Sequence, residues 1–148
     1  MLLLTCNRVE YYLSGEDHQQ LLHSLDDHLR QDRGLAPEAD RSHLYKHCGV
    51  EALRHLFRVA SSINSMVVGE PQILGQVKEA YFHSVRAGVS DPHLDRILHR
   101  AFTVAKRVRS DTAIGRSALS VSHAAVDLAK MVFGRFIDKR CMVLGGGE

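Results

Sequence analysis

Several features are missing from this sequence of 148 residues, and each absence excludes a class of protein. The three cysteines, Cys6, Cys48 and Cys141, are an odd number and form no Cys-x-x-Cys pair, so neither a disulfide framework nor a zinc ribbon is predicted. No apolar run approaches the roughly 20 residues that a membrane-spanning helix needs. The start of the chain, Met1 to Thr5, lacks the basic region and the long apolar stretch of a signal peptide. These absences favour a cytoplasmic protein with no membrane partner.

A strong charge of either sign is also missing. Nineteen Lys and Arg against seventeen Asp and Glu give a net charge of +2, which by itself gives no reason to expect a nucleic-acid partner. What is present is ordinary for a globular domain, with 45% apolar and 24% charged residues. The length is sufficient for a single core, so we expect one domain or a piece of something larger.

The first third of the chain predicts strands beside a helix. Residues 1–5 and 9–13 are apolar or β-favouring runs, and Cys6 with Asn7 between them predicts a β-hairpin with a cysteine at its tip, since Asn tolerates a positive φ. Leucines at helical spacing predict an amphipathic helix over residues 17–33. The alternation of residues 43–47 predicts a short strand.

Four apolar stripes predict helices over most of the remaining chain, through residues 52–60, 73–85, 94–108 and 121–132. Asp91 is the expected N-cap of the third helix, with Pro92 at its first position, and Gly134 is expected near the end of the fourth. Residues 141–144 predict a buried strand that enters three glycines, as in the first half of a dinucleotide-binding fingerprint.

The hairpin tip is the first candidate for chemistry. A free cysteine is usually a small buried hydrophobe, and that is the prediction for Cys48 and Cys141. Cys6 instead has polar neighbours on both sides, and the nearby guanidinium of Arg8 favours the thiolate, which is the nucleophilic form. A nucleophilic cysteine is therefore one interpretation of this turn.

A second candidate surrounds the start of the helix near residue 72. Ser65, Glu70, Gln72 and Gln76 offer uncharged or acceptor groups that suit an ammonium or hydroxyl ligand, and Pro71 fits the first helical turn. A capped helix with a solvated polar face is the commoner explanation, and it stays open.

The histidines give one further candidate and no metal site. His55 lies roughly 130° from the centre of its helix's apolar stripe, taking about 100° per residue, so it is either exposed or faces the cysteine turn. His43 and His47 with Cys48 fit no strong zinc signature, so no metal site is predicted.

The last helical region holds a run of basic residues. Such a run is usually a solvated helix face, and the alternative is a surface that contacts phosphates. The residues are Arg96, Arg100, Lys106, Arg107, Arg109 and Arg116.

Three blocks of the sequence, TCNRVEYYL, GEPQILGQVKEAY and AKRVRSDTAIGRSALSVS, resemble in the same order the motifs of the glutamyl-tRNA reductase family. The resemblance implies NADPH-dependent reduction of glutamyl-tRNA to glutamate-1-semialdehyde, the first step of the five-carbon route to tetrapyrroles. Cys6 matches the family's nucleophile, which forms a thioester and frees the tRNA, and His55 matches a histidine important for activity. The positions that hold the glutamyl substrate, with Arg8 pairing its carboxylate, match Thr5, Asn7, Arg8, Ser65, Glu70, Pro71, Gln72 and Gln76.

The resemblance also implies an α+β fold and a division into domains. Residues 1–138 match the catalytic domain, an incomplete ferredoxin-like sheet layer followed by a helical region, with a strand and a helix expected before Met1. Residues 139–148 match the start of a Rossmann-type NADP-binding domain, in which Gly145 and Gly147 belong to a cofactor site that is mostly missing here. The chain is thus expected to be a fragment truncated at both ends. Family members form homodimers through a further domain, and the next pathway enzyme, an aminomutase, is a possible partner.

Two other functions stay open. One is a tRNA-binding module without chemistry, in which the basic helix matters and Cys6 is incidental. The other is an NADP-dependent aldehyde dehydrogenase, which also uses a cysteine thioester but needs a complete dinucleotide fold and no tRNA. A covalent glutamyl adduct excludes the binding module, and dependence on tRNA excludes the dehydrogenase.

Overall fold

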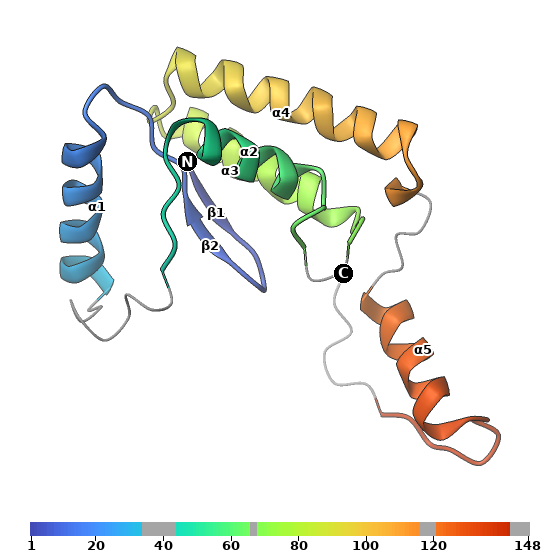
Figure 1. The fold of residues 1–148 in the computed structure, drawn as a ribbon. Coiled ribbons are helices and arrows are strands. Elements are labelled where there is room, and N and C mark those ends of the chain that lie inside the picture. The colour runs from blue at the N-terminus through green and yellow to red at the C-terminus, as the bar shows by residue number, and fades with distance from the viewer. Residues whose placement is uncertain (34–43, 66–67, 116–120, 143–148) are drawn as a thin grey trace. The chain divides into compact units, whose positions relative to one another are not determined.

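The computed structural model describes residues 1–33, 44–65, 68–115 and 121–142 (Figure 1). The chain divides into two units, residues 1–118 and 119–148, and each is described by itself. Over the described ranges the first unit contains a two-stranded sheet and the helices α1 to α4, and the second contains α5. None of the helices in these ranges is long and apolar enough to cross a membrane.

The predicted β-hairpin is confirmed. Strand β1 (Leu2–Leu4) pairs antiparallel with β2 (Val9–Tyr11). In the turn between them, the hydroxyl of Thr5 accepts hydrogen bonds from the backbone N–H groups of Asn7 and Arg8 at 3.2 and 3.1 Å. The Thr5 side chain therefore closes the turn, and Asn7 does not adopt the positive φ that its residue type allows.

The strand predicted at residues 43–47 is wrong for its described part, residues 44–47, which are in no strand. Side chains hold this segment instead: the Tyr45 hydroxyl donates to the Glu10 carboxylate, and Lys46 Nζ lies 3.8 Å from a carboxylate oxygen of Asp26. The alternation of five residues does not show whether a neighbouring strand is available for backbone pairing. Residues 44–47 form no such pairing. The α+β class is confirmed, with two strands in the described part of the sheet.

The core of the first unit lies between β1 and three of the helices. Helices α2 (Gly49–Ala60), α3 (Gln72–Arg86) and α4 (Pro92–Asp111) pack against one another, and β1 packs against α3. Because the predicted stripes recur at helical spacing, each helix directs its apolar side to this common core. The core residues that are fully buried there are Leu3, Leu56, Val59, Ala60, Val77, Leu98, Ala101 and Ala105.

Two helix starts follow the expected capping chemistry. Helix α1 (His18–Arg33) is preceded by Asp17, whose carboxylate accepts two backbone N–H groups of the first turn at 2.9 and 3.1 Å. Asp91 caps α4 in the same way, at 2.7 and 3.1 Å, with Pro92 at the first position. Pro71, expected inside the first turn of α3, directly precedes that helix.

In the loop between α2 and α3, Gly69 lies close to the 3₁₀ turn Ala113–Gly115 that follows α4. Gly69 has φ +86°, and a Cβ at this position would lie 2.4 Å from the backbone oxygen of Ile114. Its N–H donates to the carbonyl of Ser62 at 2.9 Å. Glycine alone satisfies both the left-handed backbone and the close approach.

The second unit contains the predicted fourth apolar stripe as α5 (Val121–Phe133). Gly134 follows with φ +67°, and its N–H donates to the Lys130 carbonyl at 2.8 Å, which ends the helix as expected. Cys141 and Met142, the described part of the predicted strand, are in no strand. The rest of that segment, with Gly145 and Gly147, lies outside the described residues, and the Rossmann-type strand stays a prediction.

The prediction that two of the cysteines are buried is wrong. Cys48 and Cys141 are both exposed, as Cys6 is. Cys48 lies just before α2 and Cys141 lies beyond α5, so neither belongs to an apolar stripe that would direct it into a core.

Candidate functional site

The candidate nucleophile lies at an accessible point of the hairpin. Cys6 is exposed in the turn that Thr5 closes, and the N–H of Thr5 donates to the carbonyl of Arg8 at 3.0 Å across the base of that turn. A short, hydrogen-bonded turn fixes the backbone on both sides of the sulfur. An exposed sulfur on a fixed backbone is suited to attack on a large substrate.

Arg8 extends from the tip toward β2 and the loop that follows α2. Its Nη1 lies 3.2 Å from Oε1 of Glu10, and its Nη2 donates to the backbone carbonyl of Asn64. The side chain is only 13% exposed. The guanidinium therefore joins the hairpin to the α2–α3 loop, and the carboxylate that it binds in this structure is the chain's own Glu10.

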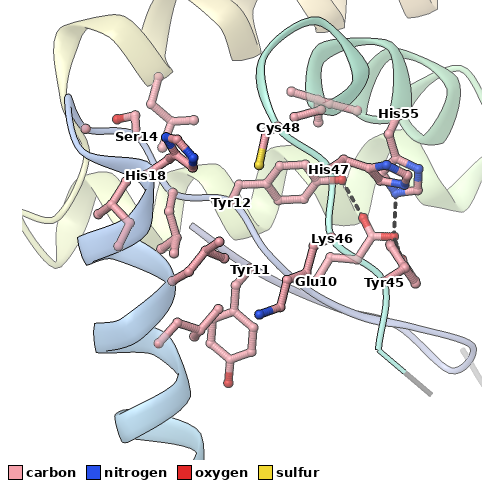
Figure 2. A pocket seen from close by; sticks show the side chains of 18 of the residues that line it. Glu10, Tyr11, Tyr12, Ser14, His18, Tyr45, Lys46, His47, Cys48 and His55 are labelled. Carbon is pink, nitrogen blue, oxygen red and sulfur yellow. Dashed lines mark hydrogen bonds and ion pairs between the residues drawn. The ribbon is translucent and has the colours of Figure 1, made fainter. Parts of the chain in front are cut away.

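Glu10 is the centre of the site. Although it is a carboxylate, it is 6% exposed, and it accepts hydrogen bonds from the hydroxyls of Tyr12 and Tyr45 as well as from Arg8 and His55 (Figure 2). Burial alone raises the pKa of Glu10. The hydrogen bonds from Tyr12, Tyr45 and His55, with the attraction of His55, outweigh burial and hold that pKa below its ordinary value.

The pKa values of the two tyrosines shift in the opposite direction. Burial, together with the hydrogen bond to Glu10 and its negative charge, raises the pKa of Tyr12, and the same causes raise the pKa of Tyr45 to about 12. Both phenols therefore keep their protons and act as hydrogen-bond donors at neutral pH.

His55 faces Glu10 of strand β2, whereas the sequence left open an exposed ring or one that faces the cysteine turn. Its Nε2 lies 2.9 Å from Oε1 of Glu10, and its side chain is 13% exposed. The ring also contacts those of Tyr45 and His47, with centroids 5.4 and 4.8 Å away. Figure 2 shows Tyr12, Tyr45 and His55 converging on the Glu10 carboxylate from the hairpin, the extended segment and α2.

Two hollows adjoin this cluster. A cleft of about 520 Å³ is lined by Asn7, Arg8, Val9, Leu44, Tyr45, His47, His55 and Asn64. A larger groove of about 780 Å³ runs between the hairpin and the leucines of α1. Tyr45, His47 and His55 line both, so these rings lie at the junction of a polar cleft and a mostly apolar groove.

The second predicted group of residues lies elsewhere. Ser65, Glu70, Pro71, Gln72 and Gln76 are not among the described residues that line the cleft. Ser65 has a buried Oγ with no hydrogen-bond partner among the described atoms, and the backbone oxygen of Glu70 accepts from Ser62 and Arg109 at 2.7 and 3.3 Å. Gln72 is exposed and Gln76 is half-buried on α3. The structure thus places Asn7, Arg8 and His55 on one cleft, and the described residues that line this cleft include neither Cys6 nor the second group.

Sequence reasoning missed Glu10 and Tyr45. A partial signal for Glu10 was available, because hairpin pairing places it opposite Leu3 and opposite residues point to the same face; that this face is the buried one is shown by the structure. No comparable signal marks Tyr45, which reaches Glu10 from a segment with no regular structure. Among the described residues, no three His, Cys, Asp or Glu side chains are arranged to hold a metal ion.

Comparison with known proteins agrees with the motifs. Residues 1–112 match the family described as glutamyl-tRNAGlu reductase, N-terminal domain. The chain belongs to the glutamyl-tRNA reductase family. The reductase match covers the hairpin, α1 to α4 and every residue of the Glu10 cluster.

Similar full sequences carry the same name. The chain is 51% identical over its whole length to a glutamyl-tRNA reductase of Geobacter metallireducens, 50% to one of Syntrophobacter fumaroxidans and 47% to one of Solibacter usitatus. It spans 34%, 32% and 35% of these relatives, which is about a third of the length of each. No solved structure matches the chain.

Proposed function

We propose that this chain carries the acyl-transfer site of a glutamyl-tRNA reductase, with Cys6 as the nucleophile. The family membership supports the substrate class, and the observation that carries the proposal is the exposed Cys6, which directly precedes Asn7 of the cleft that Arg8 and His55 also line. The reaction is the first step of the five-carbon route to tetrapyrroles, and we propose the cytoplasm as its compartment.

The proposed step balances with the groups present. Cys6 Sγ forms a bond to the ester carbonyl carbon of glutamyl-tRNA, and the bond from that carbon to the ribose oxygen breaks. The thiol proton moves to His55, which returns a proton to the ribose oxygen as the tRNA leaves. The products are a glutamyl thioester on Cys6 and uncharged tRNA. Asn7 and Arg8, next to Cys6 in the chain, line the same cleft as His55, which supports this assignment.

The roles of the remaining predicted residues are also proposals. Arg8 keeps N–H groups beyond those that bind Glu10 and Asn64, and a guanidinium is suited to the carboxylate of a glutamyl group. We propose that Thr5 holds the turn and that the residues near the start of α3 contact the glutamyl group in the complex: Ser65, Glu70, Pro71, Gln72 and Gln76.

NADPH, when bound, supplies the hydride that reduces the thioester to glutamate-1-semialdehyde. The cofactor residues proposed for it, Gly145 and Gly147, lie outside the described residues, so every step argued here belongs to acyl transfer. The resemblance assigns most of that site to a further domain. For the 148-residue chain we therefore expect hydrolysis of the thioester to glutamate, with no dependence on NADPH. A homodimer and an aminomutase partner remain proposals that rest on the resemblance alone.

The test is to incubate the 148-residue chain with radiolabelled glutamyl-tRNA and to identify the labelled residue by mass spectrometry. We expect label on Cys6, release of uncharged tRNA and no adduct in Cys6→Ser. Cys48→Ser and Cys141→Ser are matched controls, because both cysteines are exposed, as Cys6 is, but neither lies in the hairpin turn. A thioester that persists in Cys6→Ser overturns the proposal, and NADPH-dependent semialdehyde from this chain overturns the assignment of the cofactor site.

A tRNA-binding module without chemistry is the second candidate. Arg96, Arg100 and Lys106 are exposed on α4, as is Arg107, which lies 3.7 Å from Asp111. Such a surface suits phosphates. Salt-dependent tRNA binding without any covalent adduct would favour this candidate over acyl transfer.

A further inference from the structure

Glu10 is a buried carboxylate whose polar neighbours are all donors. Arg8 Nη1 lies 3.2 Å from Oε1, His55 Nε2 lies 2.9 Å from the same oxygen, and the hydroxyls of Tyr45 and Tyr12 donate to Oε1 and Oε2. These donors come from β2 and its flanks, from the extended segment at residues 44–48, and from α2. An interior carboxylate held by donors from three segments is a fixed reference point for the side chains that bind it.

The donor count determines which nitrogen of His55 carries the proton. An ionised carboxylate only accepts hydrogen bonds, so the Nε2 that lies 2.9 Å from it must be an N–H donor. In the neutral ring, Nδ1 is then the unprotonated nitrogen. The lowered pKa of Glu10 agrees with an ionised carboxylate in this position.

The rings around His55 restrict its orientation further. The His47 ring lies 4.8 Å from it at an interplanar angle of 33°, and the Tyr45 ring lies 5.4 Å from it at 59°. Tyr45 also contacts His47, at 5.5 Å. Rotation of the imidazole therefore requires both the bond to Glu10 to break and two aromatic contacts to change.

From these contacts we infer that Glu10 is a positioning residue for acyl transfer: it fixes His55 as the Nε2–H tautomer, so that Nδ1 exchanges the proton, and it holds the guanidinium of Arg8 beside the cleft. The role of Glu10 in acyl transfer rests on the proposed function. The structural part of the inference, the tautomer of His55, does not depend on that function. A carboxylate behind a histidine that fixes its tautomer is a recurring arrangement in catalysis by histidine.

The tautomer is measured first, by long-range ¹H–¹⁵N NMR of the ¹⁵N-histidine-labelled chain, in which His55 is assigned from a His55→Gln variant. We expect the proton on Nε2 in the unmodified chain and a mixture of tautomers in Glu10→Gln, because an amide can donate to the ring as well as accept from it. A proton on Nδ1 in the unmodified chain overturns the inference.

The rate is measured second, as single-turnover transfer from radiolabelled glutamyl-tRNA. We expect Glu10→Gln to lower the rate by about 10- to 100-fold, the range that loss of a supporting hydrogen-bond partner produces at other histidines. The matched control is Glu79→Gln on α3, an exposed glutamate 3.9 Å from His83, which should stay within about twofold. An unchanged rate and tautomer in Glu10→Gln overturn the inference.

A third variant keeps the test decisive if Glu10→Gln fails to fold. Tyr45→Phe removes one donor and leaves both the Glu10–His55 pair and the ring contact in place. We expect it to keep the Nε2–H tautomer, whereas loss of that tautomer with Glu10 intact would assign the positioning role to Tyr45. If the unmodified chain forms no thioester, the proposed function fails while the tautomer measurement still decides the role of Glu10.

Discussion

The tip of the hairpin and the middle of strand β2 differ in exposure and in the number of segments that hold them. At the hairpin tip Cys6 is exposed, and the turn that carries it is closed by the neighbouring Thr5. Four residues later Glu10 is 6% exposed and is bound from three separate segments. A group that attacks a macromolecule must be accessible, while a group that orients others must be fixed, and burial provides that fixation.

The α2–α3 loop belongs with the fixed part of the site. Its Asn64 carbonyl accepts from Arg8, its Gly69 lies close to Ile114 in the turn after α4, and its Glu70 carbonyl accepts from Arg109 of α4. Arg8 therefore connects an accessible tip to a loop that the helical core holds in place. The comparison predicts large effects for substitutions at Glu10 and Gly69 and small effects on stability at the tip.

The largest effect on stability is expected for Glu10→Ala. The substitution leaves Arg8, Tyr12 and His55 with unsatisfied donors in a half-buried site, and we expect the free energy of unfolding to fall by about 3 kcal/mol. Urea denaturation followed by circular dichroism measures it. The control is Cys6→Ala, which should change that free energy by less than about 0.5 kcal/mol. Equal losses in the two variants would remove the distinction between tip and base.

The next effect is expected for Gly69→Ala, which tests the loop. A Cβ 2.4 Å from the Ile114 oxygen forces the backbone to shift, and the positive φ adds to the strain, so we expect a loss of about 2 to 3 kcal/mol. Gly88→Ala is the matched control, because Gly88 has φ +68° with nothing within 4 Å of the added Cβ. It should lose only about 1 kcal/mol. Similar melting temperatures for the two variants would mean that the close approach of Gly69 to Ile114 does not constrain the loop.

The sequence predicts local features of the fold better than contacts between distant segments. The hairpin, the helical stripes and the caps at Asp91 and Gly134 were predictable, because each depends on residues close together in the chain. The turn residues could be proposed as a candidate site from the same local pattern, and that stays a prediction. What could not be predicted is contact between distant segments: Tyr45 with Glu10, Arg8 with Asn64, and the absence of a backbone ladder at residues 44–47.

The motif also suggested a different role for Arg8 from its contacts here. Sequence and resemblance pair its guanidinium with a substrate carboxylate, whereas the structure pairs it with Glu10 and Asn64. The sequence shows that Arg8 lies two residues before Glu10, but not that its side chain reaches the Glu10 carboxylate. The two roles are compatible because a guanidinium has five N–H donors.

Arg8→Lys sharpens this point with a smaller effect. The ammonium keeps the charge but cannot reach Glu10 and Asn64 together in the geometry of the planar fork. We expect kcat/KM for glutamyl-tRNA to fall by about tenfold, which corresponds to a loss of about 1.4 kcal/mol of transition-state stabilisation. The preference for glutamyl-tRNA over glutaminyl-tRNA should narrow as well. Steady-state kinetics on the two substrates measure both quantities. An unchanged preference would confine Arg8 to its structural contacts with the loop.

The smallest effect is expected at a second carboxylate, which is the solvent-accessible counterpart of Glu10. The hydroxyl of Ser14, just after the hairpin, and the N–H groups of Leu94 and His93 together outweigh burial and lower the pKa of Asp91 below its ordinary 3.8. A carboxyl whose pKa is lower in the folded state stabilises the fold fully above its ordinary pKa, and that contribution is lost as the pH falls through the lowered value. Asp91→Asn keeps an N-cap acceptor and removes this titration, so its stability at pH 7 should change by less than about 1 kcal/mol. Between pH 5 and pH 2 the unmodified chain should lose slightly more stability than Asp91→Asn does, while the titration of Glu10 acts equally on both. Thermal melts across that range measure the difference, and identical acid dependence in the two chains would show that Asp91 makes no ionised contribution to the start of α4.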